Sequence, residues 1–224
     1  MKLIVATQNL RIATARESIS PRSDLFWVKR MKQIARNIRE ACCDVVCVQE
    51  ALGHLQLQVL KYYLKDYRYI STLQGLTPSR VAIFYHNDFK LIRKQRRLLS
   101  KAESITKHAR YAVTATLHIG RRYFDVSSVH LSPYSEKAFK EGVEKTFELK
   151  GIIAGDFNAE YKNFEDKTYF MRKTDNNIRE TYITKGTIID FVFAPFYYRM
   201  DTTQVKGDRY ASDHLLVYAP IWIN

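Results

Sequence analysis

The segment Gly151-Ile152-Ile153-Ala154-Gly155-Asp156-Phe157-Asn158 sets two polar side chains directly after a short apolar run. Such a run, bounded by glycine, predicts a buried strand over residues 151–155. Asp156 and Asn158 follow its end, where on their own they could simply build an Asx turn. An ionised carboxylate beside a buried strand costs free energy unless it is paired or ligated. The segment therefore predicts a strand that carries an acid and an amide at one edge of a sheet.

Five further apolar runs carry polar residues at one end in the same way. They are Thr7-Gln8-Asn9-Leu10, Val48-Gln49-Glu50, Val129-His130-Leu131, Ile189-Asp190-Phe191 and Ser212-Asp213-His214. Each polar residue alone has a structural explanation: a turn former, a helix cap, a core histidine or a loop pair. Asp190 fits such an explanation least, because it interrupts an apolar strand. If the six strand ends converge, they form one acidic cleft that contains histidine.

Apolar runs along the chain predict about ten strands and few helices. The predicted strands are 2–9, 44–49, 67–72, 80–85, 90–98, 109–118, 123–131, 151–155, 188–194 and 215–221, with 197–203 as a weaker candidate. Gly120-Arg121-Arg122 predicts a tight hairpin turn between two of them. This pattern favours a mixed α+β or α/β layered sandwich. A Rossmann domain is disfavoured, since neither G-x-G-x-x-G nor a P-loop follows the first strand.

Helical spacing predicts two helices. The first follows a breaker at residues 20–23 and is capped by Asp24, and the second covers residues 55–64. The expected core residues are Leu25, Val28, Met31, Ala35 and Ile38 in the first helix and Leu55, Val59, Tyr62 and Tyr63 in the second.

The composition is that of a globular protein, with 46% hydrophobic and 26% charged residues among 224. This excludes a disordered or collagenous chain. Because no linker or low-complexity tract interrupts the sequence, we expect one domain over residues 1–224. Cys42, Cys43 and Cys47 are odd in number and close together, a poor set for disulfides or zinc. They are expected to be buried thiols in a reducing compartment.

Lysine and arginine total 36 against 23 acidic residues, a formal charge of +13. Such an excess favours an anionic partner, although a basic run can also be only a solvated face. The basic residues cluster at Lys90, Arg93, Lys94, Arg96, Arg97, Lys101, Lys107 and Arg110. No apolar run is long enough to span a membrane or to form a signal peptide, so we expect a cytoplasmic protein, with a monomer as the default.

The six polar blocks, in this order, resemble the endonuclease/exonuclease/phosphatase superfamily. This is the deoxyribonuclease-I-like fold, shared with apurinic endonucleases and sphingomyelinases, and the resemblance runs from residue 5 to residue 220. It implies a four-layered α/β sandwich, in which two mixed β-sheets pack face to face and are flanked by helices. The site is implied at one rim of the sandwich. Residues 132–150 are short for a family that often places a longer helical segment there.

Hydrolysis of a phosphodiester needs a metal ion that neutralises phosphate charge, a base that positions water, and donors for the developing negative charge. The resemblance implies metal ligation by Glu50, Asn9 and Asp213, catalysis by His130, Asp156, Asn158, Asp190 and His214, and phosphate binding by Arg11, Asn9 and Asn158. Carboxylate oxygen suits Mg²⁺, and Mn²⁺ shares such ligands. His214 is expected to pair with Asp190, which would fix the ring tautomer and raise its pKa.

Arg11 departs from the family pattern, because many members carry an acidic metal ligand two places after the first-strand asparagine. Arginine cannot bind Mg²⁺ but can bind phosphate.

The fold does not decide the phosphoester. The charge and the 29 aromatic residues favour a nuclease, most simply an endonuclease that cuts DNA with Mg²⁺. The alternatives are a phosphatase or phosphodiesterase for lipid or small-molecule phosphates, and a weakly catalytic nucleic-acid-binding protein.

Overall fold

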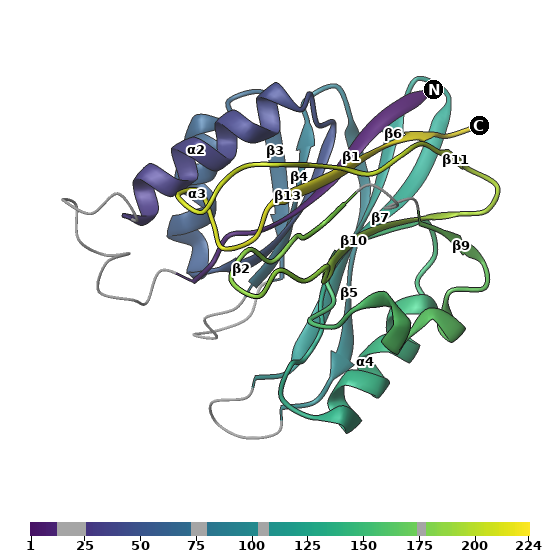
Figure 1. Ribbon diagram of the computed structural model, residues 1–224. Helices are drawn as coiled ribbons and strands as arrows, with labels where there is room; N and C mark the ends of the chain where they lie inside the picture. Colours follow the sequence, from purple (N-terminus) through teal and green to yellow (C-terminus); the bar gives the residue numbers. More distant parts are fainter. Residues whose placement is uncertain (13–25, 73–79, 103–107, 174–177) are drawn as a thin grey trace.

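One of the two sheets is mixed and has the first strand of the chain, β1, at an inner position (Figure 1). The computed structural model describes residues 1–12, 26–72, 80–102, 108–173 and 178–224. In these ranges β1 (Lys2–Asn9) pairs antiparallel with β13 (Leu216–Trp222) and parallel with β2 (Val45–Ala51). The sheet is completed by β4 (Arg80–His86) and β3 (Tyr67–Ser71) beyond β2, and by β11 (Arg199–Met200) and β12 (Gln204–Lys206) beside β13. The first and last of these long strands are therefore neighbours, and the Met1 amino group donates to Ile223 O at 2.8 Å.

A second sheet packs on the first, with the strand order β5-β6-β7-β8-β10-β9 among the described residues. Its strands are β5 (Lys90–Ser100), β6 (Arg110–Ile119), β7 (Arg122–His130), β8 (Ile152–Asp156), β9 (Met171–Arg172) and β10 (Asp190–Pro195). Among the described strands of this second sheet, only β7 and β8 pair in parallel. Gly120, at φ +59°, turns the chain between β6 and β7, as the hairpin sequence predicts.

Helices cover the outer faces of both sheets. α2 (Trp27–Glu40) and α3 (Gly53–Tyr63) lie side by side against the first sheet, and α4 (Glu136–Phe147) covers the second (Figure 1). Two short 3₁₀ turns, η1 (Tyr161–Asn163) and η2 (Glu165–Lys167), lie on the same side as α4. The expected four-layered sandwich of two mixed sheets flanked by helices is confirmed.

Strand alternation divides the apolar residues between the layers. On β1, Leu3 and Val5 pack in the core between the sheets, whereas Ala6 packs against the helices. A buried polar chain also crosses between the sheets: Thr7 Oγ1 donates to Gln49 Oε1 at 3.0 Å, and Gln49 Nε2 donates to Ser128 Oγ at 3.2 Å. This chain lies next to the ends of β1 and β2 and ties the two sheets together there.

The expected core face of α3 is wrong in part, since Val59 and Tyr63 pack against the core but Leu55 and Tyr62 do not. In α3 the buried side chains are Gln56, Leu57 and Leu60, while Leu55 is 61% exposed and Tyr62 is 68% exposed. The sequence has apolar residues on both faces of this helix, and the sheet packs against the face that carries Leu57 and Leu60. Helical spacing does not predict α4, which Ser135 caps by accepting from Ala138 N at 3.2 Å. The Asp24 cap, Leu25 and the breaker at residues 20–23 lie outside the described residues.

All three cysteines are free thiols; Cys43 and Cys47 are buried as expected, but Cys42 is exposed.

Within the described ranges the helices are too short or too polar for any of them to cross a membrane.

Candidate active site

The sheet topology brings the six polar strand ends to one rim. β1 and β2 are parallel, with Asn9 opposite Gln49, so Glu50 follows beside Asn9. In the second sheet His130 pairs with Asp156 across the parallel strands β7 and β8, and Asp156 pairs with Asp190 across the antiparallel strand β10. Because β13 is antiparallel to β1, the residues before it, including Asp213 and His214, reach the same rim.

Asp156 lies at the centre of this group and is 1% exposed. Its Oδ2 accepts from Asn9 Nδ2 at 2.9 Å, and its Oδ1 accepts from the Asn158 backbone at 2.8 Å. The Nε2 atoms of His130 and His214 lie 3.5 and 3.9 Å from Oδ2. Burial first and the charge of Asp190 second raise the pKa of Asp156 to about 7. The carboxyl group can therefore exchange a proton near neutral pH.

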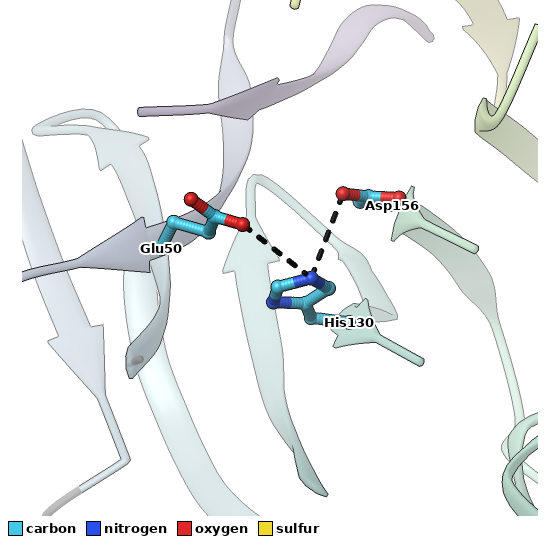
Figure 2. A group of neighbouring side chains, drawn as sticks. All are labelled: Glu50, His130 and Asp156. Atoms are coloured by element: carbon cyan, nitrogen blue, oxygen red, sulfur yellow. Dashed lines mark ion pairs between the residues drawn. The ribbon is translucent and has the colours of Figure 1, made fainter. Parts of the chain in front are cut away.

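Glu50 approaches from the other sheet. Its Oε1 lies 3.9 Å from His130 Nε2, so that nitrogen sits between the carboxylates of Glu50 and Asp156 (Figure 2). Glu50 Oε2 accepts from the backbone of Ile12 at 3.1 Å. The Glu50 side chain is 27% exposed, which leaves part of its carboxylate open to the cleft.

His130 is held by Arg110, which the sequence places only in a basic run. Arg110 Nη1 donates to His130 Nδ1 at 3.1 Å. A guanidinium has no acceptor, so Nδ1 must accept and the neutral ring carries its proton on Nε2. Burial first, then the charges of Arg110 and His214, hold the pKa of His130 well below its usual value. His130 is thus a neutral Nε2–H donor facing Asp156 and Glu50.

Arg110 itself is 7% exposed, so it is part of the buried site and not of a solvated face. Its guanidinium lies 5.5 Å from the centre of the Tyr134 ring. The one signal for Arg110 in the sequence is that it lies at one end of an apolar strand, as the six polar blocks also do.

His214, unlike the neutral His130, carries a positive charge. Its Nδ1 donates to Asp190 Oδ2 at 2.9 Å. Burial alone would lower the pKa of His214, but the charges of Asp190, Asp156 and Asp213 outweigh it and raise this pKa to about 10. The ring also packs against Tyr182, with 4.7 Å between ring centres. His214 is therefore an imidazolium at neutral pH, with Nε2–H directed toward Asp156.

Asp190 is fixed from the backbone side, because Thr181 Oγ1 accepts from the Asp190 and Ile189 amides at 3.1 and 3.0 Å. Its Oδ1 is buried and has no hydrogen-bond partner among the described residues. The site thus holds carboxylate charge that its neighbours satisfy only in part.

Arg11 and Asp213 form the edge of the site beyond β1. Arg11 Nε lies 3.7 Å from Asp213 Oδ2, so Asp213 faces Arg11. Beneath them the buried Arg30 donates to Leu10 O at 2.9 Å and to Arg11 O at 3.1 Å. Burial first and Arg11 second lower the pKa of Arg30 to about 10, which leaves it charged at neutral pH. Sequence reasoning missed Arg30, which the helical pattern places among polar residues.

Backbone strain gathers at this rim. Of the four non-glycine residues with positive φ in the described ranges, Arg11 (55°), Glu50 (57°) and Asn158 (53°) belong to the site. This conformation costs about 1–2 kcal/mol for a residue with a Cβ, and such strain clusters at functional sites. Asn158 Nδ2 also donates to Leu131 O at 3.0 Å, which ties β8 to the end of β7.

Residues 6–214 match the family model described as the endonuclease/exonuclease/phosphatase family. The chain belongs to this family. The endonuclease/exonuclease/phosphatase family consists of hydrolases that act on phosphoester bonds and depend on a divalent metal.

Solved structures of the same fold cover nearly the whole chain. An endonuclease/exonuclease/phosphatase from Bacteroides vulgatus has 18% identity and a TM-score of 0.84, with 100% of both chains covered. A mannosyl-6-phosphatase from Bacteroides thetaiotaomicron has 22% identity and a TM-score of 0.80, covering 99% of this chain and 100% of that one. A humanized D. rerio TDP2 has 16% identity and a TM-score of 0.78, with 99% of both chains covered. No curated protein sequence matches this chain significantly.

The donor set fits the divalent metal of the endonuclease/exonuclease/phosphatase family. Ligand atoms of Glu50, His130 and Asp156 all lie within 4.8 Å of one another. Since His130 Nε2 carries a proton, the free lone pairs belong to the two carboxylates, and oxygen donors suit a hard cation. The raised pKa of Asp156, caused first by burial, shows that protein cations leave its charge incompletely balanced. A cleft of about 430 Å³ opens over Glu50, Asp156 and His214.

Proposed function

We propose that the protein is a divalent-metal-dependent phosphodiesterase, most specifically an endonuclease that cuts DNA. The proposal rests on one observation: a carboxyl group that can act as a base and a positively charged histidine lie beside the same cleft. A buried carboxyl group with a pKa of about 7 lies 3.9 Å from a histidine held protonated by Asp190. This pairing combines a base near its working pH with a fixed cation for a phosphate.

Asp156 positions a water molecule and takes its proton as the water oxygen attacks phosphorus. The bond from phosphorus to the leaving oxygen then breaks, the leaving oxygen takes a proton from solvent, and Asp156 releases its proton to solvent, giving a phosphate monoester and an alcohol. The imidazolium of His214 stabilises the charge that develops on the phosphoryl oxygens. His130 donates from Nε2 to the same group, and Arg110 keeps that proton on Nε2. Asn9 and Asn158 hold the two oxygens of Asp156 in place.

Glu50 would hold the divalent ion, Mg²⁺ or Mn²⁺, beside Asp156, and the ion would supply Lewis-acid stabilisation of the phosphate. Asn9 and Asp213, the other ligands implied by the sequence, contact Asp156 and Arg11 here, so Glu50 is the stronger candidate. Arg11 is a candidate phosphate contact on the Asp213 side of the cleft.

The choice of DNA rests on charge. The formal charge of +13 and the exposed cations of β5 favour a long polyanion, because every phosphate neutralised releases counterions. A monomer in the cytoplasm stays a prediction.

The test is incubation with supercoiled plasmid in Mg²⁺ and in chelator. We expect metal-dependent nicking, and a loss of at least ~100-fold in rate for Asp156→Asn and His214→Ala, as for removal of a positioned acid–base group. His118→Ala, a histidine that stacks on Tyr123 away from the rim, is the matched control and keeps full rate. Full activity of both site variants would refute the assignment.

Other outcomes select the alternatives. Release of phosphate from lipid, inositol or sugar phosphates with the plasmid intact would establish a small-molecule phosphatase. Metal-independent binding without cutting would establish a nucleic-acid-binding protein.

A further inference from the structure

Arg30 lies in the first turn of α2, buried beneath the catalytic rim. It is 0% exposed, which is rare for an arginine, because burial of a guanidinium costs free energy unless its donors find partners. Nη1 donates to Leu10 O at 2.9 Å, and Nη2 donates to Arg11 O at 3.1 Å. One buried cation of α2 therefore holds two successive peptide groups at the point where the chain leaves β1.

The amide sides of the same two peptide groups contact site residues. The peptide group between Leu10 and Arg11 donates through Arg11 N to Asn9 Oδ1 at 2.8 Å. The next peptide group donates through Ile12 N to Glu50 Oε2 at 3.1 Å. A trans peptide group is planar, so its C=O and N–H bonds point in opposite directions. A contact that fixes the direction of each carbonyl therefore also fixes the direction of each amide.

Both acceptors of these amides belong to the proposed reaction. Asn9 accepts on Oδ1, so its Nδ2 is directed to Asp156 Oδ2, at 2.9 Å. Glu50 accepts on Oε2, which leaves Oε1 on the side of His130, 3.9 Å from Nε2 (Figure 2). Hydrogen bonds that are linked in this way polarise and align one another. Arg30 is thus connected to two carboxylates of the site through one short backbone segment.

The segment that Arg30 holds is strained. Arg11 has φ 55° and Glu50 has φ 57°, a conformation that is costly for residues with a Cβ. The two hydrogen bonds from Arg30 lie on either side of Arg11, on the carbonyl before it and on its own carbonyl. They stabilise the strained backbone, and with it the directions of the two amides.

We propose that Arg30 is a positioning residue that sets these two peptide groups and thereby orients Asn9 and Glu50. Arg30 does not touch the substrate, since it is fully buried and does not line the catalytic cleft. The inference rests on the proposed function, in which Glu50 and Asp156 are the working carboxylates. Loss of Arg30 should impair turnover and metal binding although every side chain of the cleft is still present.

The experiment compares Arg30→Met, which has an apolar side chain without donors, with Arg39→Met. Arg39 is the matched control, because it lies at the other end of α2 and also donates from its guanidinium to a backbone carbonyl, Tyr63 O. In plasmid nicking with Mg²⁺ we expect Arg30→Met to lower kcat by roughly 10- to 100-fold with little change in KM, as for loss of a contact that orients metal ligands. Arg39→Met should keep both values, and Arg30→Lys, which restores a charged donor, should regain part of the lost kcat.

Binding of Mn²⁺ to the metal-free protein, measured by calorimetry without DNA, provides a readout independent of turnover. We expect roughly 10- to 100-fold weaker binding by Arg30→Met and unchanged binding by Arg39→Met. Circular dichroism establishes that each variant is folded at the assay temperature. If Arg30→Met is not folded, Arg30→Gln, which lacks the two-pronged guanidinium, replaces it in both measurements.

Wild-type kcat and Mn²⁺ affinity in the folded Arg30 variant, or equal losses in the Arg30 and Arg39 variants, overturn the inference and leave the phosphodiesterase proposal in place. A wild type that binds Mn²⁺ but does not nick plasmid refutes the proposed function instead, and the Mn²⁺ affinities of the variants then decide the positioning role alone. A wild type that neither nicks plasmid nor binds Mn²⁺ refutes both.

Discussion

The pKa values of Asp156 and His214 are both raised, but by different surroundings. Asp156 is buried beside another carboxylate, which favours its neutral form, whereas His214 is buried among three carboxylates, which favour its charged form. Near neutral pH the carboxyl group of Asp156 can therefore exchange its proton, whereas the ring of His214 keeps its own. Asp190 acts on both groups at once: after burial it is the second cause for Asp156, and it is the largest raising cause for His214.

The raised pKa of His214 predicts a stability difference that depends on pH. A histidine that binds its proton more tightly when folded stabilises the protein fully below its unfolded pKa of about 6.5. That contribution is lost as pH rises toward the folded pKa of about 10. In metal-free protein, the thermal midpoint of the wild type should therefore fall relative to that of His214→Gln between pH 6.5 and 10, as measured by calorimetry.

His118→Gln serves as the control for this pH series, and its midpoint should follow that of the wild type. A wild-type midpoint that keeps a constant offset from His214→Gln over the whole range would contradict the charge state assigned to His214.

The charge state of His130 could not be predicted from its own neighbourhood in the sequence. Its position at a strand end indicates a site residue, because a polar group buried there without a partner costs free energy. The pKa of His130 is lowered first by burial and then by Arg110, which lies 20 positions earlier in the sequence and contacts it from the start of β6. A local sequence pattern identifies a polar residue at the end of a strand, but it does not identify the distant cation that contacts this residue in the fold.

The alignment of β7 with β8 sets the distance between His130 and Asp156. Gly155 lies opposite Val129 in this parallel pair, and a Cβ built on Gly155 would lie 2.1 Å from Val129 O. Backbone atoms cannot yield as a flexible side chain can. The two strands therefore approach closely only because residue 155 is glycine.

Gly155→Ala should separate β7 from β8 and cost about 3 kcal/mol of unfolding free energy, near the upper range for overpacking. Denaturant unfolding measures this cost, and nicking activity should fall with it because His130 and Asp156 move apart. Gly120→Ala, whose added Cβ meets no atom within 4 Å, is the matched control. It should cost only about 1 kcal/mol, through its positive φ, and should keep activity. Equal losses in the two variants would contradict the role given to close strand approach.

Strand positions were easier to predict from the sequence than helix faces. The buried strands β1, β2 and β8 are continuous apolar runs that end in polar residues, so their order and ends can be read directly. α3 carries apolar residues on both faces, so only its contact with the sheet selects Leu57 and Leu60. Half of the residues of α4 are charged, and its burial of Ala138 and Val143 depends on the sheet beneath it.

The cations of the protein differ in exposure, and two groups of them have distinct roles. Arg30 and Arg110 are buried and hold the site together, whereas Lys90, Arg93, Lys94 and Arg96 are exposed along β5, the edge strand of the second sheet. Only exposed cations can exchange counterions for phosphates. The β5 cations are therefore the candidates for long-range contact with a nucleic acid.

Binding to duplex DNA in chelator should weaken steeply with salt, and glutamine at Lys90, Arg93, Lys94 and Arg96 should flatten that dependence. Each lost phosphate contact reduces the slope of log K against log salt by ~0.9. Fluorescence anisotropy over a salt series measures the slope. The control variant carries glutamine at four exposed cations of α2, Lys29, Lys32, Arg36 and Arg39, and has the same net charge. Equal flattening in both variants would assign the effect to net charge and not to β5.

The pairing of β1 with β13 has a consequence for biosynthesis. The hydrogen bond between Met1 and Ile223 joins positions 222 residues apart, so β1 has no partner on that side until β13 has been made. Non-local pairing of this kind is slow to form and leaves an open strand edge in the meantime. A nascent chain that stalls before residue 213 also lacks His214. Interrupted translation would then yield a product that aggregates through β1 and has no imidazolium with which to meet a phosphate.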